Sequence, residues 1–227
     1  MEIWIDTAND KFIEKIAELG ITTGVTTNPS IASISNYPLE KLISILLQIQ
    51  DGYVAVQVIA DDYEGIVQQA QILHAISPRI VVKIPVIQEG LKAIKALSQR
   101  GVNTLATAIF EPSQALLAFL AGANYLAPYL GKIEDLGKDP LEVLEEIQAI
   151  KELYGFEGKI MAAGIRGPSL ITECAKRGIC AVTVPEGVLR NYLDDNTNTL
   201  AALLQFSSDW EKAEPSDLLE QNKVVSR

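Results

Sequence analysis

The sequence has one histidine, His74, and two cysteines, Cys174 and Cys180, among its 227 residues. A single histidine excludes a histidine-ligated metal cluster and a Ser-His-Asp triad. The two cysteines do not form a Cys-x-x-Cys pair, so we expect a reducing compartment and no disulfide framework. Phosphate-binding signatures of the GxxxxGKS type are also absent. We therefore expect chemistry that needs neither a metal nor another cofactor.

Long apolar runs and an excess of positive charge are missing as well. No stretch reaches the roughly 18 apolar residues of a transmembrane helix, and the acidic start, MEIWIDTAND, is not typical of a secretory signal. Lys and Arg number 19 against 29 Asp and Glu, which gives a net charge of −10. This balance argues against nucleic acids and anionic membranes as partners. We expect a cytoplasmic protein that binds a small molecule, and an anionic one would need a local cationic pocket.

Short apolar runs alternate with helical patterns along the chain. Runs that are apolar on both faces are typical of parallel strands covered by helices, and prolines after Glu111 and Asp139 indicate helix starts. An open doubly wound sheet is the alternative, but no GxGxxG turn follows the first run. We predict an α/β fold, a (β/α)8 TIM barrel with an extra C-terminal helix. The expected strands are 2–6, 23–27, 53–59, 79–85, 103–109, 123–128, 159–164 and 180–185.

The last part of the chain differs from the repeating pattern. Because no internal linker appears, we predict a single barrel domain over 1–227, with 195–227 as a C-terminal helical extension. The amphipathic part of this extension is expected to pack either on a neighbouring subunit or on its own barrel. Its apolar residues are Leu200, Leu203, Leu204 and Phe206.

Lys83 lies in the otherwise apolar segment RIVVKIP, where two-residue alternation puts it on the same face as Val81. Burial there removes water from the ammonium group and favours the uncharged amine. A free amine attacks a ketone to form a carbinolamine and then an imine. The structural alternatives are a lysine that snorkels from a strand end or one that pairs with a carboxylate.

Five further polar residues fall at or near the ends of other expected strands. Barrels of this type have their active sites at the carboxyl ends of the strands, so these side chains can converge on the barrel mouth. A carboxylate there can bind substrate hydroxyls, and a Gln, Thr and Tyr trio can hold a water that carries a proton. Each residue also has an ordinary explanation as a helix cap, a turn residue or a β-former. The five are Asp6, Asn28, Gln57, Thr107 and Tyr129.

The seventh expected strand runs into AAGIRGPS, which is typical of a phosphate-binding loop. Barrels often hold phosphate with the loops after strands 7 and 8, at the amino terminus of a helix. Gly164 and Gly167 allow close backbone approach, and the Arg166 guanidinium can hold an oxyanion through two hydrogen bonds. Lys132, after the sixth strand, can add a second cation. An arginine on a solvated loop is the alternative.

Four segments match a known pattern: GVTTNPSI at 24–31, VVKIPV around Lys83, TAIF at 107–110 and AGANYLAPYLGKIED at 121–135. Together they resemble the small transaldolase family, and its fructose-6-phosphate aldolase branch in particular. The resemblance implies that Lys83 is the Schiff-base lysine and Asp6 the carboxylate that contacts substrate hydroxyls. It makes Gln57, Thr107 and Tyr129 a water-holding catalytic trio. It also implies substrate contacts from Thr26, Asn28, Ala127, Lys132, Gly164 and Arg166.

Three positions distinguish the branches of this family. True transaldolases usually carry Glu, Phe and Ser at the positions of Gln57, Tyr129 and Ala127. The resemblance therefore favours a class I aldolase that cleaves and forms fructose 6-phosphate from dihydroxyacetone and glyceraldehyde 3-phosphate. One alternative is the transaldolase reaction of the pentose phosphate pathway, which transfers the dihydroxyacetone unit to erythrose 4-phosphate. The second is a non-catalytic sugar-phosphate-binding barrel, which has no need of a reactive amine.

The sequence departs from the family pattern at two positions. Gly164 stands where the family usually has a phosphate-binding serine, and Lys132 replaces the more usual arginine. Both changes weaken the expected contacts with phosphate. The sequence therefore leaves two kinds of natural substrate open, a sugar phosphate and an unphosphorylated keto-sugar or aldehyde. The family also forms homo-oligomers, decamers of two pentameric rings in which the C-terminal helix crosses between neighbours. The resemblance thus implies a pentamer or decamer.

Overall fold

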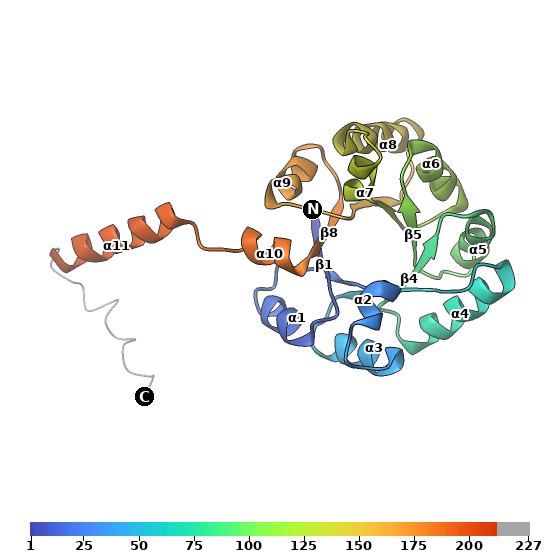
Figure 1. The fold of residues 1–227 in the computed structure, drawn as a ribbon, viewed down its shortest axis with the longest axis horizontal. Helices are drawn as coiled ribbons and strands as arrows, with labels where there is room; N and C mark the ends of the chain where they lie inside the picture. Colours follow the sequence, from blue (N-terminus) through green and yellow to red (C-terminus); the bar gives the residue numbers. More distant parts are fainter. Residues whose placement is uncertain (213–227) are drawn as a thin grey trace. The chain divides into compact units, whose positions relative to one another are not determined.

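Eight parallel strands close into a barrel in sequence order, with the first paired to the last (Figure 1). The structure is a computed structural model that describes residues 1–212. It confirms the predicted (β/α)8 TIM barrel with a further C-terminal helix. The strands are β1 (Glu2–Asp6), β2 (Gly24–Thr26), β3 (Tyr53–Gln57), β4 (Ile80–Pro85), β5 (Thr104–Ile109), β6 (Tyr125–Pro128), β7 (Lys159–Ala162) and β8 (Ala181–Pro185).

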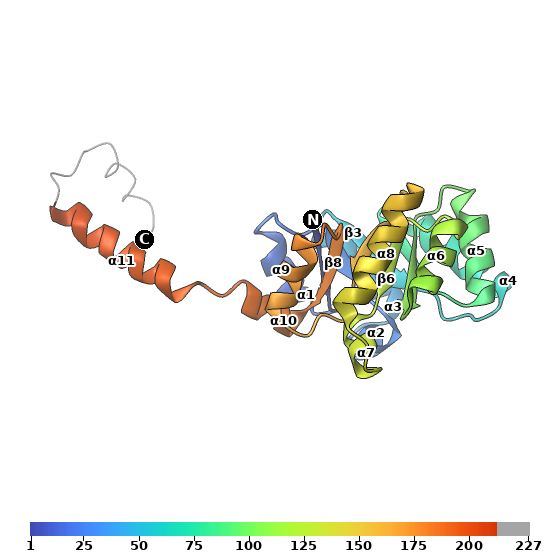
Figure 2. The ribbon, with the colours of Figure 1, turned by 90° about the horizontal axis from the view of Figure 1, so that it is seen from above.

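Within Met1–Leu189, helices alternate with these strands and surround the barrel (Figures 1 and 2). Proline at the first turn begins α6 (Pro112–Ala121), α8 (Pro140–Tyr154) and α9 (Pro168–Lys176), where its missing N–H leaves no hydrogen bond unmade. Gly122 ends α6 in a left-handed conformation with φ 88°, which favours glycine. The other helices are α1 (Asp10–Ala17), α2 (Pro29–Ser33), α3 (Leu39–Gln48), α4 (Tyr63–Ile76), α5 (Gln88–Ser98), α7 (Leu130–Asp135), α10 (Glu186–Tyr192) and α11 (Thr197–Lys212).

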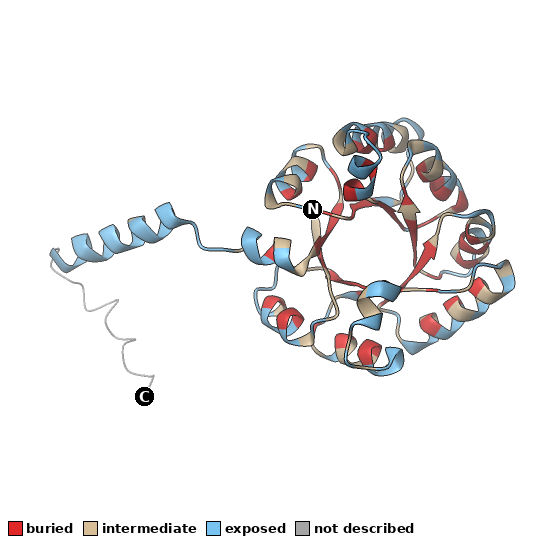
Figure 3. Cartoon of the chain, viewed as in Figure 1, coloured by how far each residue is buried: buried red, intermediate tan, exposed pale blue. Residues whose placement is uncertain are grey.

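Buried side chains fill the inside of the barrel, so it is a packed core and not a pore. The barrel strands are accordingly coloured mostly as buried in Figure 3. Trp4 is fully buried; its ring stacks on Tyr53 with centroids 5.9 Å apart and meets the edge of Tyr125 at 5.4 Å. Glu2 accepts hydrogen bonds from Trp4 Nε1 at 3.0 Å, Tyr125 OH at 3.2 Å and Lys159 Nζ at 2.5 Å. These contacts close the amino-terminal end of the barrel.

The chain divides into two compact units, Met1–Leu189 and a second that begins at Arg190. The first unit contains the whole barrel, and the predicted single domain over 1–227 stays a prediction. The predicted extension 195–227 includes the helix α11, while residues 213–227 lie outside the described ones. No helix within residues 1–212 is long and apolar enough to cross a membrane. Large apolar residues on α11 are 43% to 74% exposed: Leu200, Leu203, Leu204, Phe206 and Trp210.

Candidate active site

Lys83 lies near the carboxyl end of β4, and its side chain is only 3% exposed. It follows Val81, a residue of the barrel interior, at two-residue spacing, so it points inward as predicted. Its Nζ donates a hydrogen bond to the Thr27 carbonyl at 3.3 Å and lies 5.9 Å from the centre of the Tyr129 ring. Within residues 1–212 no carboxylate forms an ion pair with this amine. The lysine is therefore neither snorkelling into solvent nor part of a salt bridge.

Two layers of inward-facing residues surround the amine. The residues two positions earlier on neighbouring strands, such as Ala55 and Leu105, belong to the interior cluster, so alternation turns Gln57 and Thr107 inward too. In barrels of this type each layer comes from alternate strands. The even-numbered strands contribute Thr26, Lys83, Ala127 and Thr183. The odd-numbered strands contribute Asp6, Gln57 and Thr107, and Ala163 follows directly after β7.

Asp6 ends β1 and accepts a hydrogen bond from the Thr26 hydroxyl at 2.6 Å. The Thr26 hydroxyl also lies 2.5 Å from that of Thr183 on β8. Burial raises the pKa of the Asp6 carboxyl, while the positive charge of Lys83 and the Thr26 hydrogen bond oppose this shift. Asp6 and Lys83 thus interact electrostatically without forming a direct ion pair.

The hydroxyl groups of Thr107 and Tyr129 lie 2.8 Å apart, within hydrogen-bond distance. Next to Thr107 the pairing of β5 with β6 shifts register, and Ala108 has a φ of 59°, which is rare for a residue other than glycine. Irregularities of this kind re-aim side chains next to active sites. The Tyr129 ring packs edge-on against Phe110 with centroids 5.9 Å apart. Gln57, the third expected member, pairs in register with Lys83.

Within the described residues, Gln57 forms no direct hydrogen bond to the Thr107 and Tyr129 pair. Gln57 and Thr107 belong to the same layer of inward-facing residues, so the trio is brought to one end of the barrel without being in mutual contact. The Thr107 and Tyr129 side chains touch, and Gln57 lies on β3, the strand between β2 and the strand of Lys83.

Asn28 follows β2 and caps α2, because its Oδ1 accepts a hydrogen bond from the Ile31 amide at 2.9 Å. Asn28 is thus a helix cap and not the turn residue of the ordinary explanation, and its side-chain oxygen already has a partner. The Nδ2 group donates to no other group among residues 1–212, which leaves it able to donate to a substrate hydroxyl.

The loop after β7 places Arg166 beside two carboxylates. Its guanidinium contacts Glu134 at 3.2 Å and Asp135 at 2.7 Å, and Lys132 Nζ lies 3.6 Å from Asp135. The hydrogen bond from Arg166 lowers the pKa of the Asp135 carboxyl. The structure brings the two expected cations together, but around acidic groups. Because all four side chains are exposed, water screens these pairs and an anion can compete for the guanidinium.

Gly164 has a φ of 68°, a left-handed conformation in which glycine is favoured over other residues. Its carbonyl accepts a hydrogen bond from the Gly131 amide at 3.1 Å, and an added Cβ would lie 3.3 Å from that amide nitrogen. A serine here would need a strained backbone or a different loop conformation. The departure from the family pattern therefore concerns the shape of the loop as well as one lost hydroxyl.

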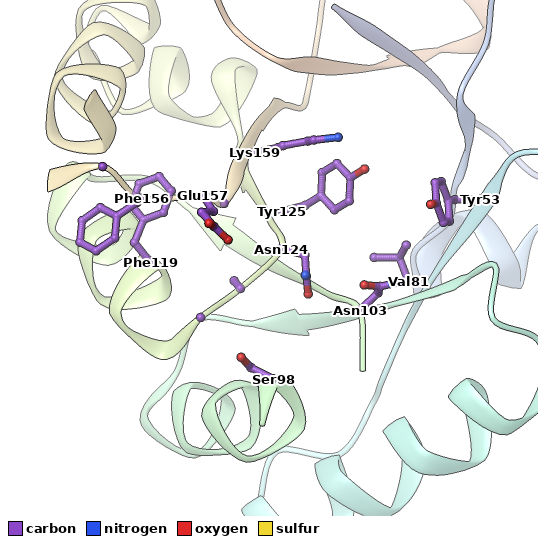
Figure 4. Close-up of a pocket in the computed structure, with 14 residues that line it drawn as sticks. Tyr53, Val81, Ser98, Asn103, Phe119, Asn124, Tyr125, Phe156, Glu157 and Lys159 are labelled. Atoms are coloured by element: carbon purple, nitrogen blue, oxygen red, sulfur yellow. The ribbon is translucent and has the colours of Figure 1, made fainter. Parts of the chain in front are cut away.

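A cavity of ≈ 710 Å³ lies at the opposite end of the barrel (Figure 4). Tyr53, Tyr125 and Lys159, which line it, are the first residues of β3, β6 and β7. None of the residues singled out from the sequence lines this cavity. Since barrels of this type carry their chemistry at the carboxyl ends of the strands, we place the candidate active site around Lys83.

Sequence reasoning misses two contributors near Lys83. Thr183 alternates with Ala181 in the segment CAVTVP, so the rule that places Lys83 inside the barrel also places Thr183 inside it. Thr27 contributes its backbone carbonyl, and no residue type reveals such a contribution. Two-residue alternation could have identified Thr183, whereas nothing in the sequence indicates the contribution of the Thr27 carbonyl.

A closed (β/α)8 barrel with a buried amine, and with a nearby carboxylate at the same end, defines a class of proteins able to form imines with carbonyl compounds. The family model described as Transaldolase/Fructose-6-phosphate aldolase matches residues 3–225. The chain belongs to this family, and it is an enzyme of the aldolase or transferase type.

Curated relatives are similar over almost their whole length. A probable transaldolase of Carboxydothermus hydrogenoformans is 41% identical over 211 residues, which cover 93% of this chain and 98% of the relative. A probable transaldolase of Petrotoga mobilis is 42% identical over 212 residues, or 93% of this chain and 96% of the relative. Among solved structures, a mandelate oxidase variant with a monooxide FMN adduct superposes with a TM-score of 0.56 at 14% identity. This match covers 82% of the present chain and spans 64% of that structure, and it reflects the fold alone.

Removal of the Asp135 carboxylate should strengthen phosphate binding at the loop. In Asp135→Asn the guanidinium of Arg166 loses its closest partner, so we expect a severalfold lower KM for glyceraldehyde 3-phosphate in aldol addition to dihydroxyacetone. Unphosphorylated glyceraldehyde should show an unchanged KM. Glu145→Gln, which removes the partner of Arg177 at 2.7 Å, is the matched control. Equal effects on both aldehydes would mean that this loop does not bind phosphate.

Proposed function

We propose that this chain is a class I aldolase that cleaves and forms fructose 6-phosphate through an imine on Lys83. The observation that carries the proposal is the Thr107 and Tyr129 hydroxyl pair, with the Tyr129 ring 5.9 Å from Lys83 Nζ. Two hydroxyl groups at 2.8 Å can hold a water and exchange protons with it, and an aldolase needs such a water to protonate the enamine, a step that transfer to an acceptor does not include. The side chains at Gln57, Tyr129 and Ala127 are those of the aldolase branch.

In the proposed reaction the Lys83 amine adds to C2 of fructose 6-phosphate and loses water to form a protonated imine. The imine accepts the electron pair of the C3–C4 bond as that bond breaks. A water on the Thr107 and Tyr129 pair removes the C4 hydroxyl proton, and glyceraldehyde 3-phosphate leaves. The same water returns a proton to C3 of the enamine. Hydrolysis of the resulting imine then releases dihydroxyacetone and restores the free amine.

Transaldolase activity is the second candidate, and the names of the curated relatives favour it. In that reaction the enamine attacks erythrose 4-phosphate and is not protonated. The chemistry up to the enamine is the same, so Lys83 and Asp6 keep their roles in both. A non-catalytic binding barrel is disfavoured by the burial of an amine that no carboxylate among residues 1–212 neutralises by direct contact.

Lys83 should be the residue that forms the imine. Incubation with dihydroxyacetone and sodium borohydride should inactivate the enzyme and attach a reduced three-carbon adduct to the peptide that contains Lys83. The measurement is peptide mass spectrometry. Lys83→Met should abolish both effects, while Lys92→Met, which changes an exposed lysine paired with Glu89, should leave them intact. An adduct on a different lysine would overturn the assignment.

Tyr129→Phe should separate imine formation from carbon–carbon cleavage. Loss of the hydroxyl removes one side of the proposed water site, so cleavage of fructose 6-phosphate should fall by about 100-fold or more. Trapping of the imine by borohydride should change little. The control is Tyr125→Phe, which removes a tyrosine hydroxyl from the opposite end of the barrel.

Release of glyceraldehyde 3-phosphate from fructose 6-phosphate decides between the two reactions. An aldolase releases it without an acceptor, because water protonates the enamine. If release by the unmodified enzyme depends strictly on added erythrose 4-phosphate, the transaldolase reaction is the correct one and the water at Tyr129 does not protonate the enamine.

We also propose that copies of the chain assemble into a pentamer or decamer through α11. Its apolar residues lie on one side of the helix at helical spacing, and each is at least 43% exposed in the single chain. Several large apolar side chains exposed together on one side of a helix are typical of an interface between subunits.

A lysine on the apolar side of α11 should weaken this assembly. Leu204→Lys puts a charge on the side that carries Leu200 and Leu203, so light scattering should show a smaller mass than for the unmodified protein. Gln205→Lys adds the same charge on the opposite side, next to its partner Asp209, and should preserve the assembly. A monomeric unmodified protein, or equal masses for both variants, would contradict the proposed role of α11.

A further inference from the structure

Thr183, which belongs to none of the roles discussed so far, sits at the end of a buried chain of hydrogen bonds. Its hydroxyl lies 2.5 Å from that of Thr26, which donates to Asp6 Oδ1 at 2.6 Å. Thr26 is fully buried and Thr183 is 2% exposed. The three residues come from β2, β1 and β8, and β1 lies between the other two strands. The chain therefore links three neighbouring strands on the side of the barrel that carries Asp6.

The direction of the hydrogen bonds follows from the number of protons. A threonine hydroxyl has one proton, and that of Thr26 is donated to the Asp6 carboxylate. The 2.5 Å contact with Thr26 therefore requires Thr183 to be the donor. Among residues 1–212 no acceptor other than Thr26 lies within hydrogen-bond distance of the Thr183 hydroxyl. The reverse direction would leave a buried hydroxyl proton without an acceptor, so the chain favours the form of Asp6 that only accepts.

This preference matters because different neighbours of Asp6 shift the pKa of its carboxyl in opposite directions. Burial raises the pKa of the carboxyl, and the charge of Lys83 and the hydrogen bond from Thr26 lower it. On the neighbouring elements, Glu186 at the start of α10 accepts hydrogen bonds from Thr7 and Asn9, and Tyr129 faces Lys83 from after β6. When Lys83 is the uncharged amine that attacks a ketone, its contribution disappears, and the hydroxyl chain is what remains to stabilise the carboxylate.

We propose that Thr183 is a positioning residue that acts through Thr26 to hold Asp6 ionised and oriented toward the Lys83 imine. The inference rests on the proposed Schiff-base function. An ionised Asp6 stabilises the positive charge of the protonated imine and accepts hydrogen bonds from substrate hydroxyls. Because a hydroxyl that accepts a hydrogen bond becomes a better donor, loss of the Thr183 hydroxyl weakens the bond from Thr26 to Asp6.

The test is the pH dependence of kcat/KM for cleavage of fructose 6-phosphate by Thr183→Val, which keeps the shape of the side chain and removes its hydroxyl. A weaker bond to the carboxylate raises the pKa of Asp6. Activity is lost as Asp6 is protonated, so the acidic limb of the profile should move upward by about 0.5 to 1 pH unit. Near the middle of the profile kcat should fall more than KM rises, because the bond acts mainly on the charged imine. Thr183→Ser keeps the hydroxyl and should restore the profile.

Thr104→Val is the matched control for removal of a buried strand hydroxyl. Thr104 is fully buried on β5, and its Oγ1 has no hydrogen-bond partner among the described residues, so the acidic limb should stay in place. Thr183→Ala serves as a second variant without the hydroxyl and should move the limb in the same direction as Thr183→Val.

A titration without substrate separates this inference from the proposed function. The 13C chemical shift of the Asp6 carboxyl in the full-length protein should report a higher pKa in Thr183→Val than in the unmodified protein and in Thr183→Ser. If the unmodified enzyme traps no adduct at Lys83, the proposed function fails even when this titration shifts. If it traps the adduct while Thr183→Val keeps both the titration and the acidic limb of the unmodified protein, the role of Thr183 is wrong.

Discussion

An amine in the wall of an apolar barrel has to be kept reactive without being neutralised. Lys83 is almost wholly buried, yet its closest polar contact is the Thr27 carbonyl, and no carboxylate among residues 1–212 pairs with it directly. A direct ion pair would stabilise the ammonium and remove the nucleophile, whereas full isolation would leave the positive charge of the proposed imine without support. Asp6 meets both requirements because it acts on Lys83 from a distance. The rest of the site keeps that separation in place.

Strand alternation explains how the barrel supplies these neighbours. Polar groups are rare in the interior of such folds, and here they lie in the two layers nearest the carboxyl ends and around Glu2 at the amino-terminal end. Below them lie apolar side chains, among them Val81, Leu105 and Met161. The polar hydroxyls are paired with one another or with Asp6, so the interior carries few unsatisfied groups. The apolar layers fix the strands, and the strands in turn fix the polar layers.

The strands and part of the candidate site can be predicted from the sequence. The other features depend on backbone conformation or on contacts between distant segments. The eight strands and the inward position of Lys83 follow from apolar runs and two-residue alternation, which depend on local residue order. The positive φ of Ala108 and the carbonyl contact of Thr27 are backbone features that no side chain announces. The pairing of Arg166 with Glu134 and Asp135 joins residues more than thirty positions apart, and its neutralising effect requires the folded loops. Gly164 looks like a lost hydroxyl in the sequence and proves to be a left-handed turn.

The group of contacts around Glu2 has a consequence for the order of events in time. Trp4, Tyr125 and Lys159 meet at that carboxylate and, with the packed apolar layers above them, separate the candidate site from the amino-terminal end of the barrel. When a molecule is cleaved at the carboxyl ends of the strands, the fragment closer to solvent has to leave before the fragment attached deeper in the barrel. Arrival must follow the reverse sequence. A site that is reached from one end only therefore releases two fragments one after the other, and the first fragment, where it accumulates, can recombine with the part that remains bound.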